Sequence, residues 1–470
     1  MRPSRLVPLV VACALFMENL DSAVIATSLP VIAADLGQDP IALKLALTSY
    51  LISLAIFIPV SGWMADRYGA RTIFRAAIGV FMAGSLACAM SSSLGGFVAA
   101  RFLQGMGGAM MVPVGRLLIL RTVSKAELVS ALAYLTVPAL IGPVAGPPVG
   151  GFITTYFDWR WIFLINIPIG IVGIVLATVY FENVREPDPP PLDFLGFVLL
   201  GFGLAALMLG LATGGRHLLP LSASIAAAVA GAVSVGLYLL RSRRVSAPVL
   251  KLELLRIPTF RAAVIGGSLF RLGVGAIPFL LPLMLQVGFG LNPLQSGILT
   301  FSAAVGALFM KTLAATILRS FGFRRVLVIN AFVCAAFVVV NGWFTPETPH
   351  AVIAAVLLIG GCFRSLQFTS LNAMSFADVP PRDMSYATSL TSMVQQLALS
   401  TGVALGAFVL ESVSLARGHA TLTGADFAPA FLVIGTLSAL SVLFFTRLDP
   451  DAGAEMSGHR AAPPRPVAAE

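Results

Sequence analysis

Two carboxylates lie three residues apart in an apolar stretch near the N-terminus, and together they could bind and release protons. Glu18 and Asp21 fall between Leu6 and Pro30, where most other residues are apolar. A carboxylate at membrane depth is costly, so we expect it to face a partner or a wet cavity. The two share a helix face, and such a pair in a dry site would hold one proton near neutral pH. Alternatively, Glu18 pairs with a basic residue and only Asp21 titrates.

Arg101 begins another apolar stretch, Arg101-Phe-Leu-Gln-Gly-Met-Gly-Gly-Ala-Met-Met111, and is a candidate partner for Asp21. A nearby guanidinium and burial have opposite effects on the proton affinity of a carboxylate. Moving the arginine away would therefore protonate Asp21, which is the switch that a proton-coupled carrier needs. Alternatively, Arg101 extends to the outer membrane surface and only anchors its helix.

Polar residues in the second half of the chain are candidates for lining a substrate cavity. Arg271 lies among Gly273, Gly275, Pro278 and Pro282, a composition typical of the broken helices that form binding sites. Buried arginine and lysine favour a negatively charged substrate, whereas Glu18 and Asp21 favour a cation or a proton. Polar stripes also hold helices together by hydrogen bonds alone. The predicted cavity residues are Gln104, Arg271, Lys311, Asn372, Ser392, Gln395 and Gln396.

A short motif, Gly62-Trp-Met-Ala-Asp-Arg-Tyr-Gly-Ala-Arg71, is a candidate gate. Asp66 at a helix C-terminus opposes the helix dipole, so a nearby positive group should offset it. Arg67, Arg71 or a helix N-terminus in the other half of the molecule could do so. A contact with the other half would latch one side of the molecule and break on opening. Alternatively, this is a basic loop that only sets topology. The predicted gating residues are Gly62, Asp66, Arg67, Gly69 and Arg71.

A run rich in glycine and proline, residues 139–151, predicts a closely packed helix. Glycines recur every four residues, so they share one face and permit close approach, while the prolines add bends. We expect a tight, bendable contact between the two halves, although ordinary small-residue packing has the same physical basis. The residues are Gly142, Pro143, Gly146, Pro147, Gly150 and Gly151.

The elements that position these residues are transmembrane helices. Apolar residues make up 58% of the chain and charged residues 11%, outside the range of soluble domains. The first span carries two acids and lacks a cleavage site, so we expect an uncleaved helix and no signal peptide. By length and hydropathy the predicted spans are 8–30, 44–65, 74–92, 97–120, 129–154, 161–181, 193–212, 219–240, 262–288, 294–318, 325–344, 351–375, 387–412 and 427–446.

The distribution of lysine and arginine predicts the orientation. With the N-terminus inside, the inner segments carry 21 of these residues and the outer segments carry four, Lys44, Arg160, Arg216 and Arg417. This ratio predicts that both termini are cytoplasmic and that the number of spans is even.

An internal repeat predicts two related halves. Ala65-Asp-Arg-Tyr-Gly-Ala-Arg71 resembles Leu318-Arg-Ser-Phe-Gly-Phe-Arg324, and each follows the second span of a six-span set. Repeated halves with a site between them are the usual plan of secondary transporters. The predicted organisation is an N-terminal six-helix half at 1–186, two inserted linker helices at 187–250, a C-terminal six-helix half at 251–446, and a disordered cytoplasmic tail at 447–470.

Several classes of function are disfavoured. No phosphate-binding Gly-x4-Gly-Lys-Ser/Thr loop occurs, so ATP hydrolysis is not expected. The net charge of +9 is spread over short loops rather than one patch, which argues against nucleic-acid binding. The four cysteines have neither zinc nor disulfide spacing. We therefore expect no enzyme activity, no metal site and no cofactor other than a proton gradient.

These motifs together resemble a known family. The chain, over about residues 10–450, is similar to the 14-helix drug:proton antiporter branch of the major facilitator superfamily, the EmrB and QacA kind. Within it, Gly107 to Arg116 and the surroundings of Lys311 look most like MdtD-type multidrug transporters. The resemblance implies an all-helical membrane protein of two six-helix halves plus two inserted central helices. It also implies proton coupling by Asp21 and Arg101, gating by Asp66 and Arg71, and antiport geometry from the glycine and proline run.

We therefore expect a multi-pass transporter of the cytoplasmic (inner) membrane. It would export small molecules in exchange for protons by alternating access, as a multidrug efflux protein does, and monomers are favoured. A first alternative is export of an organic anion or metal-chelating metabolite such as citrate. A second is a membrane sensor or assembly partner that transports nothing.

Overall fold

Helices form every regular element that the computed structural model describes. The structure describes residues 3–122, 128–183, 185, 191–213, 220–245, 248–380, 383–418, 422–457 and 459. The predicted all-helical class is confirmed over these residues.

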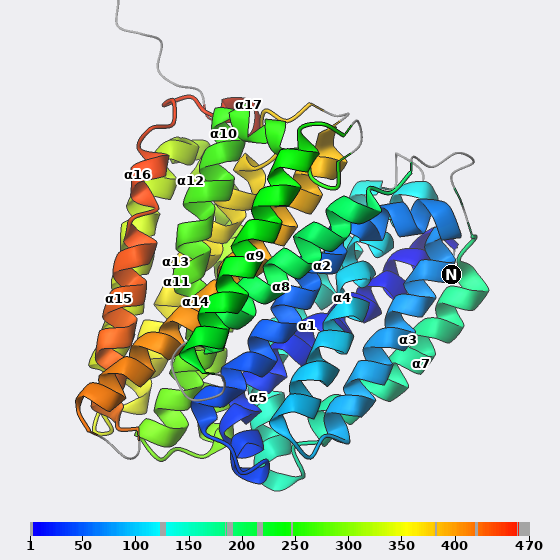
Figure 1. Cartoon of the computed structure of the whole chain (residues 1–470). Coiled ribbons are helices and arrows are strands. Elements are labelled where there is room, and N and C mark those ends of the chain that lie inside the picture. The colour runs from blue at the N-terminus through cyan, green and yellow to red at the C-terminus, as the bar shows by residue number, and fades with distance from the viewer. Residues whose placement is uncertain are drawn as a thin grey trace, which may run out of the picture.

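The N-terminal half is built from long helices joined by short loops (Figure 1). Its elements are α1 (Pro3–Asp35), η1 (Pro40–Leu43), α2 (Lys44–Tyr68), α3 (Ala70–Ala89), α4 (Leu94–Thr122), α5 (Leu128–Tyr156), α6 (Trp161–Leu164) and α7 (Asn166–Tyr180).

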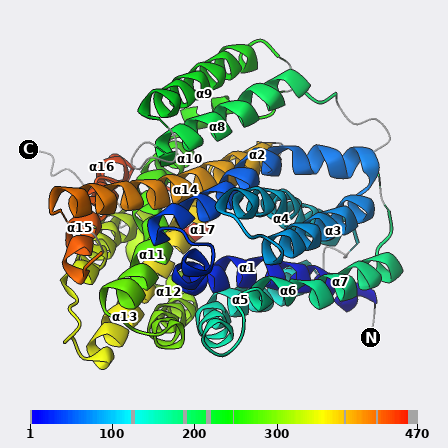
Figure 2. The same ribbon diagram turned by 60° about the horizontal axis from the view of Figure 1, so that its bottom comes forward.

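Two linker helices, α8 (Phe194–Thr213) and α9 (Leu221–Ser242), follow and lie on one side of the bundle (Figure 2). The helix α8 packs against α2 and α14 (Met384–Ala416), and α9 packs against α8. Leu200, Leu204 and Tyr238 belong to the hydrophobic cluster at this site. Because α2 and α14 belong to different halves, α8 contacts both.

The C-terminal half repeats the plan of the first. Its elements are η2 (Leu252–Arg256), α10 (Pro258–Arg261), η3 (Ala262–Gly266), α11 (Gly267–Leu283), η4 (Met284–Gly288), α12 (Pro293–Val340), η5 (Asn341–Trp343), α13 (His350–Met374), α14, η7 (Gly424–Asp426), α15 (Phe427–Ala439), α16 (Val442–Phe445) and α17 (Ala454–Ser457).

The apolar helices are consistent with the predicted fourteen spans, although the count of separate stretches is lower. Within the described residues, twelve helical stretches are long and apolar enough to cross a membrane. The longest, Pro293–Trp343, contains two spans because its backbone breaks at Gly322 (φ 71°, ψ 164°). The long helix α5 is outside those twelve and supplies the remaining span. Residues 447–457 of the predicted disordered tail carry α17, and nearly all the rest of that tail lies outside the described residues.

The repeat seen in the sequence has a matching geometry in both halves. Gly69 and Gly322 both have positive φ, 93° and 71°, which glycine adopts without the steric cost of a Cβ. Two residues later in each half, an arginine donates to the carbonyl of the residue that follows the last membrane span of that half. Arg71 Nη1 lies 3.1 Å from the Phe181 oxygen, and Arg324 Nη2 lies 2.9 Å from the Thr446 oxygen.

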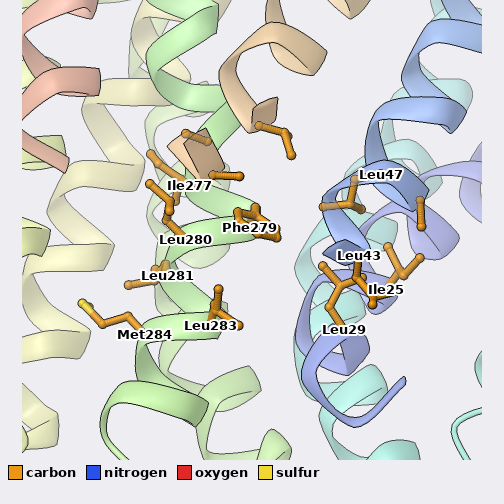
Figure 3. Packing of buried hydrophobic residues seen from close by; sticks show 14 of the residues in the cluster. Ile25, Leu29, Leu43, Leu47, Ile277, Phe279, Leu280, Leu281, Leu283 and Met284 are labelled. Carbon is orange, nitrogen blue, oxygen red and sulfur yellow. The ribbon is translucent and has the colours of Figure 1, made fainter. Parts of the chain in front are cut away.

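The two halves share a hydrophobic core at one end and have separate cores at the other. One cluster joins Ile25 and Leu29 of α1 to Ile277 and Leu280 of α11 (Figure 3). Toward the end that carries α17, each half buries its own residues instead. We call the shared end the sealed end and the opposite end the open end.

Candidate functional site

Asp21 lies at the centre of a buried polar cluster in the N-terminal half. Its side chain accepts three hydrogen bonds: from Arg101 Nη1 to Oδ2 at 2.7 Å, from Gln104 Nε2 to Oδ1 at 2.8 Å, and from Asn166 Nδ2 to Oδ1 at 2.9 Å. Asp21 is 3% exposed and Arg101 1%. Sequence analysis predicted that Asp21 and Arg101 could meet, and the structure places them in direct contact.

Residues of α3 and α2 also hold Gln104 and Arg101 in place. Gln104 donates to Ser85 Oγ at 2.8 Å and accepts from Arg101 Nη1. The Arg101 guanidinium lies 4.3 Å from the centre of the Tyr50 ring, close enough for a cation–π contact. A Cβ on Gly84 would lie 2.5 Å from the Gln104 backbone, so this glycine permits the close approach of α3 to α4.

Sequence analysis missed Asn166, Ser85 and Tyr50 as members of this cluster. Asn166 is the single amide in the apolar span 161–180, and an amide at membrane depth needs a partner. That signal indicates that Asn166 contacts a polar group but does not identify the group. Only the packing of α7 against α1 shows that the partner is Asp21.

A cavity of about 290 Å³ lies between the two halves. Ser22, next to Asp21 in the chain, lines it, and Glu18, half-buried, lies one turn before Ser22 on the same helix. The lining is mostly apolar, and Arg364 supplies the charged side chain among the described lining residues. The walls come from α1, α5, α11, α12, η5 and α13.

None of the predicted cavity residues lines this space. Gln104 turns into the Asp21 cluster, where it donates to Asp21 and Ser85 and accepts from Arg101. Arg271 is fully buried and donates to Asn372 Oδ1 at 3.0 Å, so the structure brings these two together. Lys311 is exposed in α12. The remaining three, Ser392, Gln395 and Gln396, are half-buried in α14, a helix outside the cavity walls.

The gating motif lies at the open end, within its own half. Arg71 contacts the Phe181 carbonyl, and a Cβ on Gly69 would collide with the Asn183 side chain. Asp66 is half-buried and Arg67 exposed. A Cβ on Gly62 would meet nothing within 4 Å, so this conformation has no need of a glycine there.

The glycine and proline run contacts its own half through the four-residue stripe and the other half through other residues. Cβ atoms on Gly142, Gly146 and Gly150 would all meet α1, at residues such as Asn19, Ala23 and Val24, so the four-residue stripe faces its own half. The reason is that α1 and α5 pack side by side along much of their length.

The contact between halves comes instead from the other side of α5. A Cβ on Gly151 would lie 2.5 Å from the Pro293 oxygen, and one on Gly297 would collide with the Pro147 carbonyl. The side chain of Pro143 lies outside the described residues.

A buried ion pair crosses between the halves at the sealed end, and sequence analysis missed it. Lys44 Nζ of α2 lies 3.6 Å from Glu411 Oε2 of α14, with side-chain exposures of 4% and 1%. Two hydrogen bonds cross nearby, from Gln286 Nε2 to the Thr27 oxygen at 2.8 Å and from the Leu294 amide to Thr155 Oγ1 at 3.1 Å. Lys44 was counted among the outer basic residues at the start of the predicted span 44–65, and the structure likewise makes it the first residue of α2.

Comparison with known proteins agrees with this architecture. The profile of the Major Facilitator Superfamily matches the chain twice, over residues 11–262 and 263–469. The chain belongs to the major facilitator superfamily. The two matched segments meet at the start of η3, so each covers one half, with the linker helices in the first.

Relatives and solved structures extend the comparison. Proteins that bear the multidrug resistance name MdtD, from Salmonella heidelberg (strain SL476) and Salmonella typhimurium (strain LT2), are 37% identical, with 94% of each chain covered. By fold, the chain is similar to a D-xylose-proton symporter (TM-score 0.68, 14% identity, 95% of this chain and 98% of that one). It is also similar to a bacterial homologue of the lysosomal transporter Spinster, solved inward-facing and unoccupied (0.66, 15%, 99% and 100%).

This membership establishes the class of the protein. It is a multi-pass membrane transporter of the superfamily, not an enzyme, and its members bind small-molecule substrates.

Proposed function

We propose that this transporter exports small molecules from the cytoplasm in exchange for protons, as a multidrug efflux antiporter of the inner membrane. Both termini are cytoplasmic in this proposal, because the lysine and arginine bias favours that side. The open end, which carries α17, then faces the cytoplasm, and the structure corresponds to an inward-facing state. The proton gradient supplies the energy and no other cofactor takes part.

The observation that carries the proposal is the set of donors around Asp21. An ionised carboxylate only accepts hydrogen bonds, and both oxygens of Asp21 accept from Arg101, Gln104 or Asn166. Protonation of Asp21 would turn one of its acceptor oxygens into an O–H donor. That donor would then face the N–H groups of Arg101, Gln104 and Asn166, which are donors themselves. Protonation therefore favours a different arrangement of α1, α4 and α7.

The cluster is placed to communicate with substrate. Ser22 follows Asp21 directly and lines the cavity, so a shift of α1 that accompanies protonation also changes the cavity wall. Occupancy of the cavity and occupancy of Asp21 by a proton are then linked through one helix, as coupling requires.

Proton-driven flux tests this function. The purified protein is reconstituted in liposomes with a pH-sensitive dye inside, and cationic dyes or organic anions are added under an imposed proton gradient. We expect substrate-triggered proton flux that Asp21→Asn abolishes, since asparagine keeps an acceptor oxygen but binds no proton. Arg325→Gln, an exposed charge outside the cluster, is the matched control. Equal flux in Asp21→Asn and wild type would contradict the proposal.

A second candidate substrate class is an organic anion or a metal-chelating metabolite such as citrate. It is favoured by three cations of the C-terminal half: Arg271, which is fully buried, Arg364, which lines the cavity, and Lys311. The same assay separates this class from cationic drugs. A folded protein that gives no flux with either series would favour a sensor or assembly role.

A further inference from the structure

The cavity between the halves combines an apolar lining with a guanidinium that no carboxylate neutralises. Arg364 of α13 lines it, and in the described part of the chain this side chain forms no hydrogen bond or ion pair. Arg364 is half-buried, and a cation that is partly withdrawn from water is costly unless it is paired. The uncompensated charge indicates that a ligand supplies the negative partner.

The residues around Arg364 favour a role in ligand binding over a role in stabilising the fold. Leu357, Gly360 and Gly361 of the same helix line the cavity with it, and so does Phe337 of α12. The apolar wall would accept the body of a molecule, and the planar guanidinium suits bidentate recognition of a carboxylate, sulfonate or phosphate.

Two further cations lie one turn from the cavity wall, on the open-end side. Lys311 is four residues beyond the lining residue Ala307 on α12. Arg271 is three residues before the lining residue Val274 on α11, and its Nε and Nη1 atoms have no partner among the described residues. Neither cation has a carboxylate within ion-pair distance in the described residues. Lys311 is exposed and Arg271 is fully buried, so Lys311 is the one of the two that can raise the local concentration of anions near the cavity.

We propose that this cavity binds amphipathic monoanions, with Arg364 holding the anionic group and the apolar wall of α11, α12 and α13 holding the body. The inference rests on the proposed transport function, since the cavity is the substrate site of that function. The volume of about 290 Å³ lies at the small end of ligand pockets and suits a molecule of two fused rings.

Three naphthalene derivatives of similar shape test the charge preference. Equilibrium dialysis measures binding of 2-naphthoate, 2-naphthamide and 2-naphthylmethylammonium to the full chain in lipid nanodiscs, with empty nanodiscs subtracted. We expect 2-naphthoate to bind best. Arg364→Gln should weaken 2-naphthoate about ten- to a hundredfold, the usual range for losing hydrogen bonds to a charged group. The same substitution should weaken the binding of 2-naphthamide by less than about threefold.

Two more variants sharpen the test. Arg364→Lys keeps the positive charge but loses the planar guanidinium that can bind both carboxylate oxygens, so we expect an intermediate loss of 2-naphthoate binding. Arg325→Gln, an exposed arginine on the same half, should change nothing. The thermal unfolding temperature of each variant shows that it is folded. Unchanged 2-naphthoate binding in Arg364→Gln, or an equal loss for the anion and the amide, would overturn the proposal.

The outcomes remain distinct from those of the proton-flux assay. Anion binding that depends on Arg364, without any proton flux, would support the site and contradict proton antiport. Proton flux driven by cationic dyes in Arg364→Gln, with no anion binding in wild type, would support antiport and contradict the anion site.

Discussion

At the scale of single residues, charge at membrane depth was the informative signal. Asp21 and Arg101 are 80 positions apart, yet a contact between them was one of two expectations, because each is costly without the other. The other was that Arg101 only anchors its helix at the membrane surface. Arg364 falls inside the predicted span 351–375, but its placement in the cavity wall depends on the rotation of α13. Asn166 and Ser85 could not be assigned, since amides and hydroxyls in spans commonly join helices and any polar neighbour satisfies them.

Gly62 should be required for motion rather than for folding. A side chain there meets open space in this structure, so Gly62→Leu should leave the thermal unfolding temperature in detergent nearly unchanged. When the open end closes, a leucine on this face of α2 would obstruct the approach of the other half. We expect transport to fall at least tenfold in proteoliposomes. Transport at the wild-type rate would show that Gly62 stays exposed throughout the cycle.

Gly69 should be required for folding in the structure as it stands. Gly69→Ala places a Cβ at φ 93° and against Asn183, which should destabilise the fold by at least about 1–2 kcal/mol. Unfolding of the purified protein followed by circular dichroism checks this value. Gly79→Ala is the control, because that glycine is helical with no atom within 4 Å of the added Cβ, and it should be neutral or stabilising.

At the scale of elements, hydropathy located the helices and the repeat located the break in α12. The four-residue glycine stripe was correctly placed on one helix face, but it contacts α1 of the same half, and Gly151 contacts α12. A sequence pattern predicts which residues share one face of a helix, but it does not predict which other helix that face contacts. The role of Lys44 was missed for a related reason, because Glu411 is distant in sequence and only the packing of α2 on α14 joins them.

The Lys44–Glu411 pair should hold the sealed end closed. Glu411→Gln leaves the buried ammonium without its carboxylate, which typically costs about 3–5 kcal/mol. That cost falls on the closed arrangement, so the sealed end should open more often. A cysteine at Leu47, buried in the shared core, should then react at least tenfold faster with an impermeant maleimide.

The double variant Lys44→Gln with Glu411→Gln is the matched control for that pair. Removing both charges avoids the unpaired ion, so the cysteine at Leu47 should react more slowly than in Glu411→Gln alone. Equal reaction rates in wild type and Glu411→Gln would show that the pair does not hold this end.

At the scale of the whole molecule, the plan of two halves and two linker helices follows from the repeat, while the conformation does not. The same sequence must be compatible with several arrangements of its halves, so no pattern in it specifies that one end is sealed. The contacts that seal it, such as Leu294 with Thr155, appear only in the packed structure.

Locking the sealed end should stop the cycle. The Leu294 amide lies 3.1 Å from Thr155 Oγ1, so cysteines at these two positions are near enough to be joined. We expect oxidation of Thr155→Cys/Leu294→Cys to abolish proton-coupled flux and a reductant to restore it. Each single variant, treated alike, should keep its activity. Transport by the cross-linked protein would exclude alternating access through this end.

The shared hydrophobic core has a thermodynamic consequence of its own. Opening the sealed end would bring Ile25, Leu29, Ile277 and Leu280 into contact with water (Figure 3). Hydration of apolar surface carries a positive heat capacity. The balance between the two orientations of the transporter should therefore have an enthalpy that changes with temperature, so that a van't Hoff plot of the outward-open fraction is curved rather than straight.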